Sequence, residues 1–269
     1  MLYNRSVSKK NDVTKMANAI GIFDSGLGGL TVVKQIISIL PHENIIYLGD
    51  TARVPYGPRS PEIIKRFSEE NTKFLIGKNV KCIIIACNTS SAVAAGHLKR
   101  KFHNIPIFEV IKPAITEAKK SVGSKIGVIG TRATIASGAY KVNFSVACPL
   151  LVPFIEEGDV KGKALQIILK DYLKPLKGKI DTLILGCTHY PIIEHLIQKE
   201  IGKKVKLINP EKMVAFEVQG FLQKNNILNS QKEKGKKQFF VTDLTERFTK
   251  VAEMFLGQKI SGVIQKVNL

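Results

Sequence analysis

The sequence lacks any apolar stretch near the ~20 residues that a helix needs to cross a bilayer. Its opening, MLYNRSVSKKNDVTK, also lacks the apolar core of a secretion signal. We therefore expect a soluble cytoplasmic protein in which residues 1–18 form a disordered extension. Because 44% of the 269 residues are apolar, the rest of the chain can bury a large core.

Cysteines are few, and none of them forms a closely spaced C-x₂-C pair. The chain has five histidines and four cysteines, which are Cys82, Cys87, Cys148 and Cys187. This number and spacing argue against a disulfide framework and against a structural metal site. We expect reduced thiols and no bound metal.

Arginine is scarce as well, since the 41 basic residues comprise 34 lysines and only 7 arginines. Lysine favours solvated surface over the two-pronged contacts that read nucleic-acid bases. The densest basic runs, 231–238 and 202–206, carry no interleaved aromatic residues on which bases could stack. The net charge of +19 therefore indicates a solvated basic surface with a general attraction for anionic small molecules, not a nucleic-acid site.

Short, branched apolar runs alternate with helical patterns along most of the chain. Strands are predicted at 19–24, 44–50, 81–87, 105–110, 125–130, 147–155, 181–187 and 204–210, with a further strand and helix in 237–257. Helices are predicted at 31–40, 60–78, 90–102, 112–121, 159–175 and 191–200. Nearly continuous apolar strands separated by helices are typical of the α/β class, in which parallel sheets are covered on both faces.

The pattern restarts in the second half of the chain, which predicts two similar lobes. Each lobe would be a mostly parallel sheet flanked by helices. We place 19–109 together with 220–269 in the first lobe, and 110–219 in the second. The linker-like composition of 222–237 would let the chain return to the first lobe.

Two of the cysteines lie in matching contexts, KCIIIACNTSS (81–91) and TLILGCTHYP (182–191). A thiol at the carboxyl end of a parallel strand lies where open α/β sheets bind their ligands. The helix that follows each cysteine would lower the pKa of both thiols alike. One buried cysteine is more often structural, but the repetition favours chemistry at Cys87 and Cys187. A thiol hydrolase that pairs Cys187 with His189 stays open, although it leaves Cys87 unexplained.

Four further segments place polar side chains after apolar stretches: FDSGLGGLT (23–31), GDTARVPYGPRS (49–60), GTRATIAS (130–137) and PFIEEGD (153–159). The first is a glycine-rich turn that could expose N–H groups to an anion. It does not match G-x-G-x-x-G, and no G-K-[ST] follows, which argues against a nucleotide site. Each segment also has a structural explanation, as a tight turn, a surface loop, a helix cap or solvated acids. From spacing alone, both explanations stay open.

Taken together, these stretches resemble the glutamate racemases, a family of the cofactor-independent aspartate/glutamate racemase superfamily. The stretches similar to that family's signatures, in its order, are GIFDSGLGGLTV, GDTARVPYG, ACNTSSA, GVIGTRATI, CPLLVPFIEEG and LGCTHYP. They extend over about residues 19–257. Aspartate and hydantoin racemases share the paired cysteines, but ARVPYG and CTHYP favour the glutamate enzymes.

The resemblance implies a two-base interconversion of L- and D-glutamate, without a cofactor, in a cleft between the lobes. Cys87 would serve as the base towards D-glutamate and Cys187 towards L-glutamate. Asp24 would assist Cys87, while Glu156 and His189 would assist Cys187. The residues that would hold the substrate are Asp24, Ser25, Tyr56, Gly57, Asn88, Thr89, Thr131, Thr134, Thr188 and His189.

The family also implies a bacterial cytoplasm, D-glutamate supplied to peptidoglycan, and dimers whose arrangement varies among members. Some members are reported to restrain DNA gyrase, and some N-terminal extensions are tied to regulation by a wall precursor. Residues 1–15 therefore raise a secondary binding role as a hypothesis.

Overall fold

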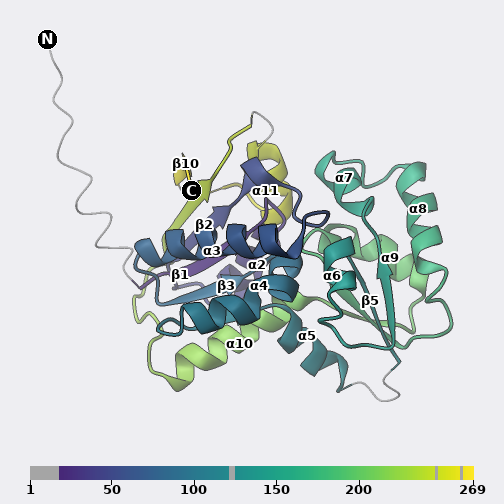
Figure 1. Ribbon diagram of the computed structural model, residues 1–269, viewed down its shortest axis with the longest axis horizontal. Coiled ribbons are helices and arrows are strands. Elements are labelled where there is room, and N and C mark those ends of the chain that lie inside the picture. The colour runs from purple at the N-terminus through teal and green to yellow at the C-terminus, as the bar shows by residue number, and fades with distance from the viewer. Residues whose placement is uncertain (1–17, 121–124, 246–247, 261–262) are drawn as a thin grey trace, which may run out of the picture.

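The structure, a computed structural model, describes residues 18–120, 125–245, 248–260 and 263–269. The predicted extension at 1–18 lies outside the described residues except for Asn18. The chain forms two α/β lobes, each built on its own sheet (Figure 1), which confirms the predicted fold class. Among the described residues, no helix is long and apolar enough to cross a membrane.

The first lobe contains a six-stranded sheet in the order β10-β9-β2-β1-β3-β4, and all of its pairings are parallel. Its strands are β1 (Ile20–Asp24), β2 (Ile45–Gly49), β3 (Cys82–Ile85), β4 (Ile107–Glu109), β9 (Lys237–Val241) and β10 (Val263–Lys266). The helical segments around it are α2 (Leu30–Ile39), η1 (Thr51–Arg53), α3 (Pro61–Gly77), α4 (Asn88–Lys101), α10 (Pro210–Lys224) and α11 (Phe248–Leu256).

The second lobe contains a four-stranded parallel sheet in the order β6-β5-β7-β8. Its strands are β5 (Ile126–Gly130), β6 (Phe144–Ala147), β7 (Thr182–Gly186) and β8 (Lys206–Ile208). Its helical segments are α5 (Ile111–Ala118), α6 (Arg132–Ala136), α7 (Leu151–Glu156), α8 (Lys163–Leu173), η2 (Tyr190–Ile193) and α9 (Glu194–Ile201).

The central strands are buried along their whole length, as the apolar runs predict. Every residue of β1, β2, β3 and β7 is buried. Strands buried on both faces need apolar side chains in both directions, so a continuous apolar run replaces the alternation of a half-exposed strand. Helices begin where local chemistry favours them: Ser60 caps α3 by accepting from the Ile63 N–H, and Pro61 occupies its first turn.

The strand predicted at 147–155 is wrong. β6 covers Phe144–Ala147, and most of the apolar run that follows forms helix α7. Pro149 and Pro153 lie in this run, and a proline cannot donate to a strand ladder but is accepted in the first turn of a helix. Strand β10, which pairs with β9 at the edge of the first sheet, was not predicted from the sequence.

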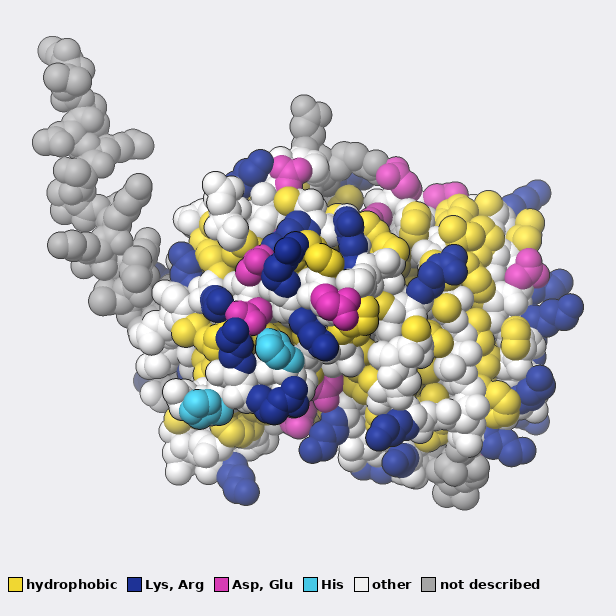
Figure 2. All heavy atoms as spheres, viewed as in Figure 1, with side chains coloured by type: hydrophobic (Ala, Val, Ile, Leu, Met, Phe, Trp, Pro, Cys, Tyr) yellow, Lys and Arg dark blue, Asp and Glu magenta, His cyan; other side chains and the backbone are white. Residues whose placement is uncertain are grey.

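On the face shown in Figure 2, basic side chains are spread out with acidic ones among them. Glu69, for example, forms ion pairs with Lys73 and Lys101 on the first lobe. This distribution fits the predicted solvated surface.

Candidate active site

A cavity of about 390 Å³ lies between the two lobes at the carboxyl ends of both sheets. Cys87 follows β3 of the first lobe and Cys187 follows β7 of the second, and both line this cavity. The fold thus brings together two thiols that are far apart in the sequence. Other predicted site residues that line the cavity are Ser25, Tyr56, Gly57, Asn88, Thr89, Thr131, Glu156, Thr188 and His189. Asp24 and Thr134 lie directly behind it, in hydrogen bonds with Gly26 and Thr131.

Cys87 caps the N-terminus of α4, and its Sγ accepts from the Ser90 N–H at 3.5 Å. The thiol also donates to Ser25 Oγ at 3.6 Å. Burial, followed by the charge of Asp24, raises the pKa of Cys87 to about 11. The helix terminus therefore does not produce the lowered pKa that the sequence predicted for Cys87, because desolvation outweighs it.

Asp24, the carboxylate whose charge acts on this thiol, lies at the end of β1 and is completely buried. Its Oδ2 accepts from the Gly26 N–H at 3.0 Å. Burial raises the pKa of Asp24, while the charge of His189 and the backbone N–H groups of Gly26 and Gly29 offset only part of the shift. A buried carboxyl with a raised pKa can hold or accept a proton close to Cys87.

Cys187 has a different environment, in which a carboxylate, an imidazole and a thiol lie in series. Glu156 Oε1 lies 2.9 Å from His189 Nε2, and His189 Nδ1 lies 3.7 Å from the Cys187 Sγ. Burial disfavours the charged imidazolium, but hydrogen bonds to Cys187 and Glu156 outweigh it and raise the pKa of His189 to about 10. Glu156 loses solvation too, yet the bond to His189 leaves its pKa lowered.

The two cysteines therefore do not have the matching surroundings that the sequence predicted. Cys187 is followed by a turn and the 3₁₀ segment η2, and α9 begins only at Glu194, so Cys187 caps no α-helix as Cys87 does. In place of a helix N-terminus, the imidazole of His189 lies next to the Cys187 Sγ.

Hydroxyl groups connect the lobes across the cavity floor. Thr89 Oγ1 of α4 lies 2.8 Å from Thr131 Oγ1, which caps α6 in the second lobe. Thr134 Oγ1 lies 2.9 Å from Thr131 Oγ1 and completes a cluster of three hydroxyls. Tyr140 of the second lobe donates to Asn88 Oδ1 of the first. These groups can donate to a carboxylate placed between the lobes.

The glycine-rich turn after β1 packs tightly against the second lobe. A Cβ on Gly28 would lie 2.3 Å from Thr188 Oγ1 and 2.5 Å from His189 Nδ1. Thr31 Oγ1 also donates to the Thr188 carbonyl at 3.1 Å. A glycine at 28 thus permits the close approach that sets Thr188 and His189 in the site.

Tyr56 lines the cavity, but its hydroxyl is used inside the first lobe, where it donates to Asp50 and accepts from Asn71. The backbone of the next residue crosses to the second lobe, because the Gly57 carbonyl accepts from the Ala133 N–H at 3.1 Å. A ligand in the cavity can therefore contact the ring of Tyr56 and the backbone of Tyr56 and Gly57.

Besides Gly26, Pro55 and Pro58, sequence reasoning missed six residues of the cavity wall, which are Val54, Pro149, Val152, Pro153, Arg132 and Glu157. All six lie inside the segments that carried the resemblance, so proximity to those motifs was the available signal. Among the described residues, no group of three His, Cys, Asp or Glu side chains could hold a metal ion.

Comparisons with known proteins identify the family of the chain. Residues 20–217 match the Asp/Glu/Hydantoin racemase family. The chain is 43% identical to a glutamate racemase of Geobacter metallireducens, over 92% of this chain and 96% of that protein. It is also 43% identical to a glutamate racemase of Aquifex aeolicus, over 91% of this chain and 96% of that protein. The structure of the Francisella tularensis glutamate racemase with D-glutamate matches with a TM-score of 0.88 at 42% identity, covering 94% of this chain and 98% of that one. The chain therefore belongs to the Asp/Glu/Hydantoin racemase family.

Proposed function

We propose that this protein interconverts L- and D-glutamate by a two-base mechanism that uses no cofactor. The single observation that carries the proposal is the pair of cysteines, one from each lobe, that line one cavity. Inversion at a carbon needs a base on one side and an acid on the other, and two thiols from opposite lobes supply both. The relatives named glutamate racemase support glutamate as the substrate.

In one direction, the thiolate of Cys187 removes the Cα proton of L-glutamate, and the C–H electron pair stays on the substrate as a carbanion. The thiol of Cys87 then delivers its proton to the opposite face, which forms D-glutamate and leaves Cys87 as the thiolate. In the reverse direction Cys87 is the base and Cys187 is the acid. The imidazolium of His189 stabilises the Cys187 thiolate, and Glu156 holds the imidazole in place. Asp24 assists Cys87 from beneath the site.

The carbanion has to be stabilised by the protein itself. The cavity is lined by hydroxyl and amide side chains, and α4 begins at its edge, so donors are already oriented where negative charge develops. We assign substrate binding to Asp24, Ser25, Tyr56, Gly57, Asn88, Thr89, Thr131, Thr134, Thr188 and His189. Tyr56 would contribute through its backbone and ring, since its hydroxyl donates to Asp50.

We further infer that the product D-glutamate is supplied to peptidoglycan synthesis in a bacterial cytoplasm. A homodimer is the assembly that we expect. Both inferences rest on the family alone.

The test measures circular dichroism of L- and D-glutamate with the wild type and with Cys87→Ala and Cys187→Ala. We expect both variants to lose racemisation. In D₂O, Cys187→Ala should still exchange the Cα hydrogen of D-glutamate without inverting it, and Cys87→Ala should do so with L-glutamate. Cys148→Ala is the matched control, because Cys148 is a buried thiol that does not line the cavity.

Racemisation at the wild-type rate by either cysteine variant would refute the two-base mechanism. Turnover of aspartate but not of glutamate by the wild type would refute the substrate.

A further inference from the structure

We propose that Asp50 is a positioning residue, whose buried carboxylate holds the Tyr56–Gly57 segment against the substrate by tying it to the C-terminal strand β9. As far as substrate affinity is concerned, the inference rests on the proposed function. It adds to the site Asp50, which does not line the cavity, and strand β9, which begins beyond the family match at 20–217.

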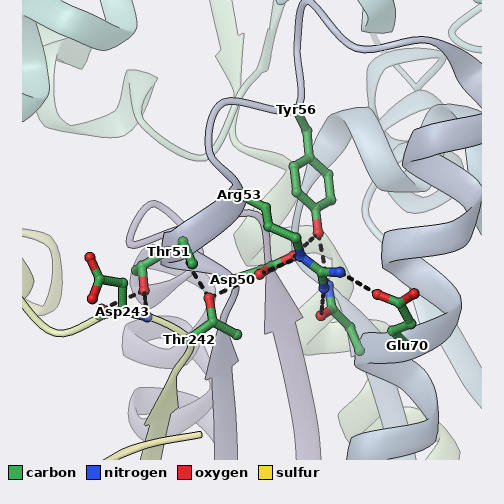
Figure 3. A network of polar contacts seen from close by, with 9 residues as sticks. Asp50, Thr51, Arg53, Tyr56, Glu70, Thr242 and Asp243 are labelled. Atoms are coloured by element: carbon green, nitrogen blue, oxygen red, sulfur yellow. Dashed lines mark hydrogen bonds and ion pairs between the residues drawn. The ribbon is translucent and has the colours of Figure 1, made fainter. Parts of the chain in front are cut away.

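Asp50 directly follows β2 and is completely buried, at the start of the loop that leads to Tyr56 (Figure 3). Four hydrogen bonds converge on its carboxylate. Oδ1 accepts from Thr242 Oγ1 at 2.9 Å and from Arg53 Nε at 2.9 Å, while Oδ2 accepts from Arg53 Nε at 2.7 Å and from the Tyr56 hydroxyl. All of these partners are donors, so only an ionised carboxylate satisfies them together.

The bond to the tyrosine orients the cavity wall. Tyr56 is buried, and its hydroxyl also accepts from Asn71 Nδ2 at 3.2 Å, so both ends of the side chain are fixed. Burial and the neighbouring Asp50 raise the pKa of Tyr56 far above its ordinary value, which keeps the hydroxyl as a donor. The adjacent Gly57 faces Thr131, and its carbonyl accepts from the Ala133 N–H of the second lobe.

The second anchor comes from the end of β9. Thr242 Oγ1, besides donating to Asp50, accepts from the Ala52 N–H at 2.8 Å. Thr51 Oγ1 donates to the Asp243 carbonyl at 2.5 Å and accepts from the Asp243 N–H at 2.7 Å. Besides the bond from Thr242 to Asp50 itself, the loop is thus attached through Thr51 and Ala52 to the two residues that follow β9. Figure 3 shows Thr51, Thr242 and Asp243 grouped next to Asp50.

Arg53 neutralises the buried charge. Its guanidinium pairs with Asp50 and with Glu70 of α3, and it lies over the Phe67 ring with 4.0 Å between the guanidinium carbon and the ring centroid. An asparagine at position 50 would retain the shape but would turn an NH₂ group toward one of these donors, whichever way it is flipped. The hydrogen bond to Tyr56 or the one to Thr242 would then be lost.

The experiment compares Asp50→Asn, Tyr56→Phe, Thr242→Val and the double variant Asp50→Asn/Tyr56→Phe with the wild type. Losing a substrate contact that is equally strong in the ground state and in the transition state raises KM and leaves kcat unchanged. For Asp50→Asn we expect KM for glutamate to rise about tenfold, because that is the effect of losing one hydrogen bond to a charged group. We expect kcat to stay within about threefold of the wild-type value. The double variant should have the KM of Asp50→Asn, because Asp50 acts through the tyrosine hydroxyl.

Glu43→Gln is the matched control. Glu43 is a buried carboxylate next to the opposite end of β2, paired with Lys81 Nζ at 2.6 Å and accepting from the Asn229 N–H at 2.8 Å. Glu43→Gln, which replaces this carboxylate with an amide, should lower the melting temperature of the protein without changing KM. Hydrogen exchange of the backbone in 50–58 should be faster in Asp50→Asn and unchanged in Glu43→Gln.

An unchanged KM in folded Asp50→Asn, or KM effects that multiply in the double variant, would overturn the proposal. If Asp50→Asn does not fold, the same criterion applies to Tyr56→Phe and Thr242→Val, each of which should raise KM. A wild type that does not racemise glutamate would refute the proposed function instead, and the exchange of 50–58 would still decide on the positioning by Asp50.

Discussion

The bond between Glu156 and His189 offers the sharpest test of how Cys187 is activated. Glu156→Gln retains the size of the side chain and removes the charge that faces His189 Nε2 at 2.9 Å. The imidazolium then loses its charged partner, and the thiolate of Cys187 loses part of the positive charge that stabilises it. We therefore expect slower proton transfer without loss of the fold.

The magnitude follows from the geometry. A hydrogen bond between charged groups is worth about 1.5–3 kcal/mol when it is buried. The Glu156 side chain is 41% exposed, so solvent screening reduces this to about 1 kcal/mol. That corresponds to about a fivefold loss in kcat/KM. The loss must be equal in both directions, because the two enantiomers have the same free energy in water.

The same substitution should change how stability depends on pH. The pKa of His189 rises from 6.5 in the unfolded chain to about 10 in the fold. The stability gained from this protonation is complete below pH 6.5 and is lost as the pH rises through about 10. We expect Glu156→Gln to melt about 2 °C below the wild type near pH 6, and the difference to shrink toward pH 10.

Initial rates by circular dichroism and thermal melts across pH 6–10 provide both measurements. Glu157→Gln is the control, since it removes the same charge from the same cavity wall while the bond from Glu156 to His189 stays in place. Equal losses of kcat/KM in the two variants, or a difference in melting temperature that grows with pH, would refute the reasoning.

Three further predictions follow from the site. Gly28→Ala should reduce kcat/KM at least about tenfold, because its Cβ would lie 2.3 Å from Thr188 Oγ1 and such overpacking costs about 1–3 kcal/mol. The control is Gly77→Ala, where the Cβ meets nothing within 4 Å, and equal activity of the two variants would contradict the prediction. Because the pKa of Cys87 is raised to about 11, Cys87 stays a thiol near neutral pH and can act as the acid towards L-glutamate, so kcat/KM for L-glutamate should fall as the pH rises through about 11; a kcat/KM that still rises there would count against that role. Arg132→Gln should lower kcat/KM for the anionic substrate and weaken its dependence on ionic strength, because Arg132 lines the cavity; a salt dependence equal to that of the wild type would exclude this role.

Local pattern was enough to predict much of the fold. Continuous apolar runs such as 82–85 and 182–186 are buried strands, because a parallel sheet covered on both faces leaves no polar side to a strand. The same reasoning failed at 147–155, where two prolines within an apolar run make a helix possible and a strand ladder poor. Hydrophobicity alone does not separate these outcomes over so short a segment.

The sequence by itself determined which residues could carry the chemistry, since the repeated cysteine context and the polar motifs after the strands are local features. Only the tertiary structure decided the surroundings of each thiol. The raised pKa of Cys87 comes from burial and Asp24, and the imidazole beside Cys187 is held by Glu156 of helix α7. Thr242 meets Asp50 across 192 positions of sequence, and no periodicity encodes that contact. Desolvation and contacts between distant segments exist only once the chain has folded. The motifs therefore indicated the candidate site residues but did not determine the electrostatics around them.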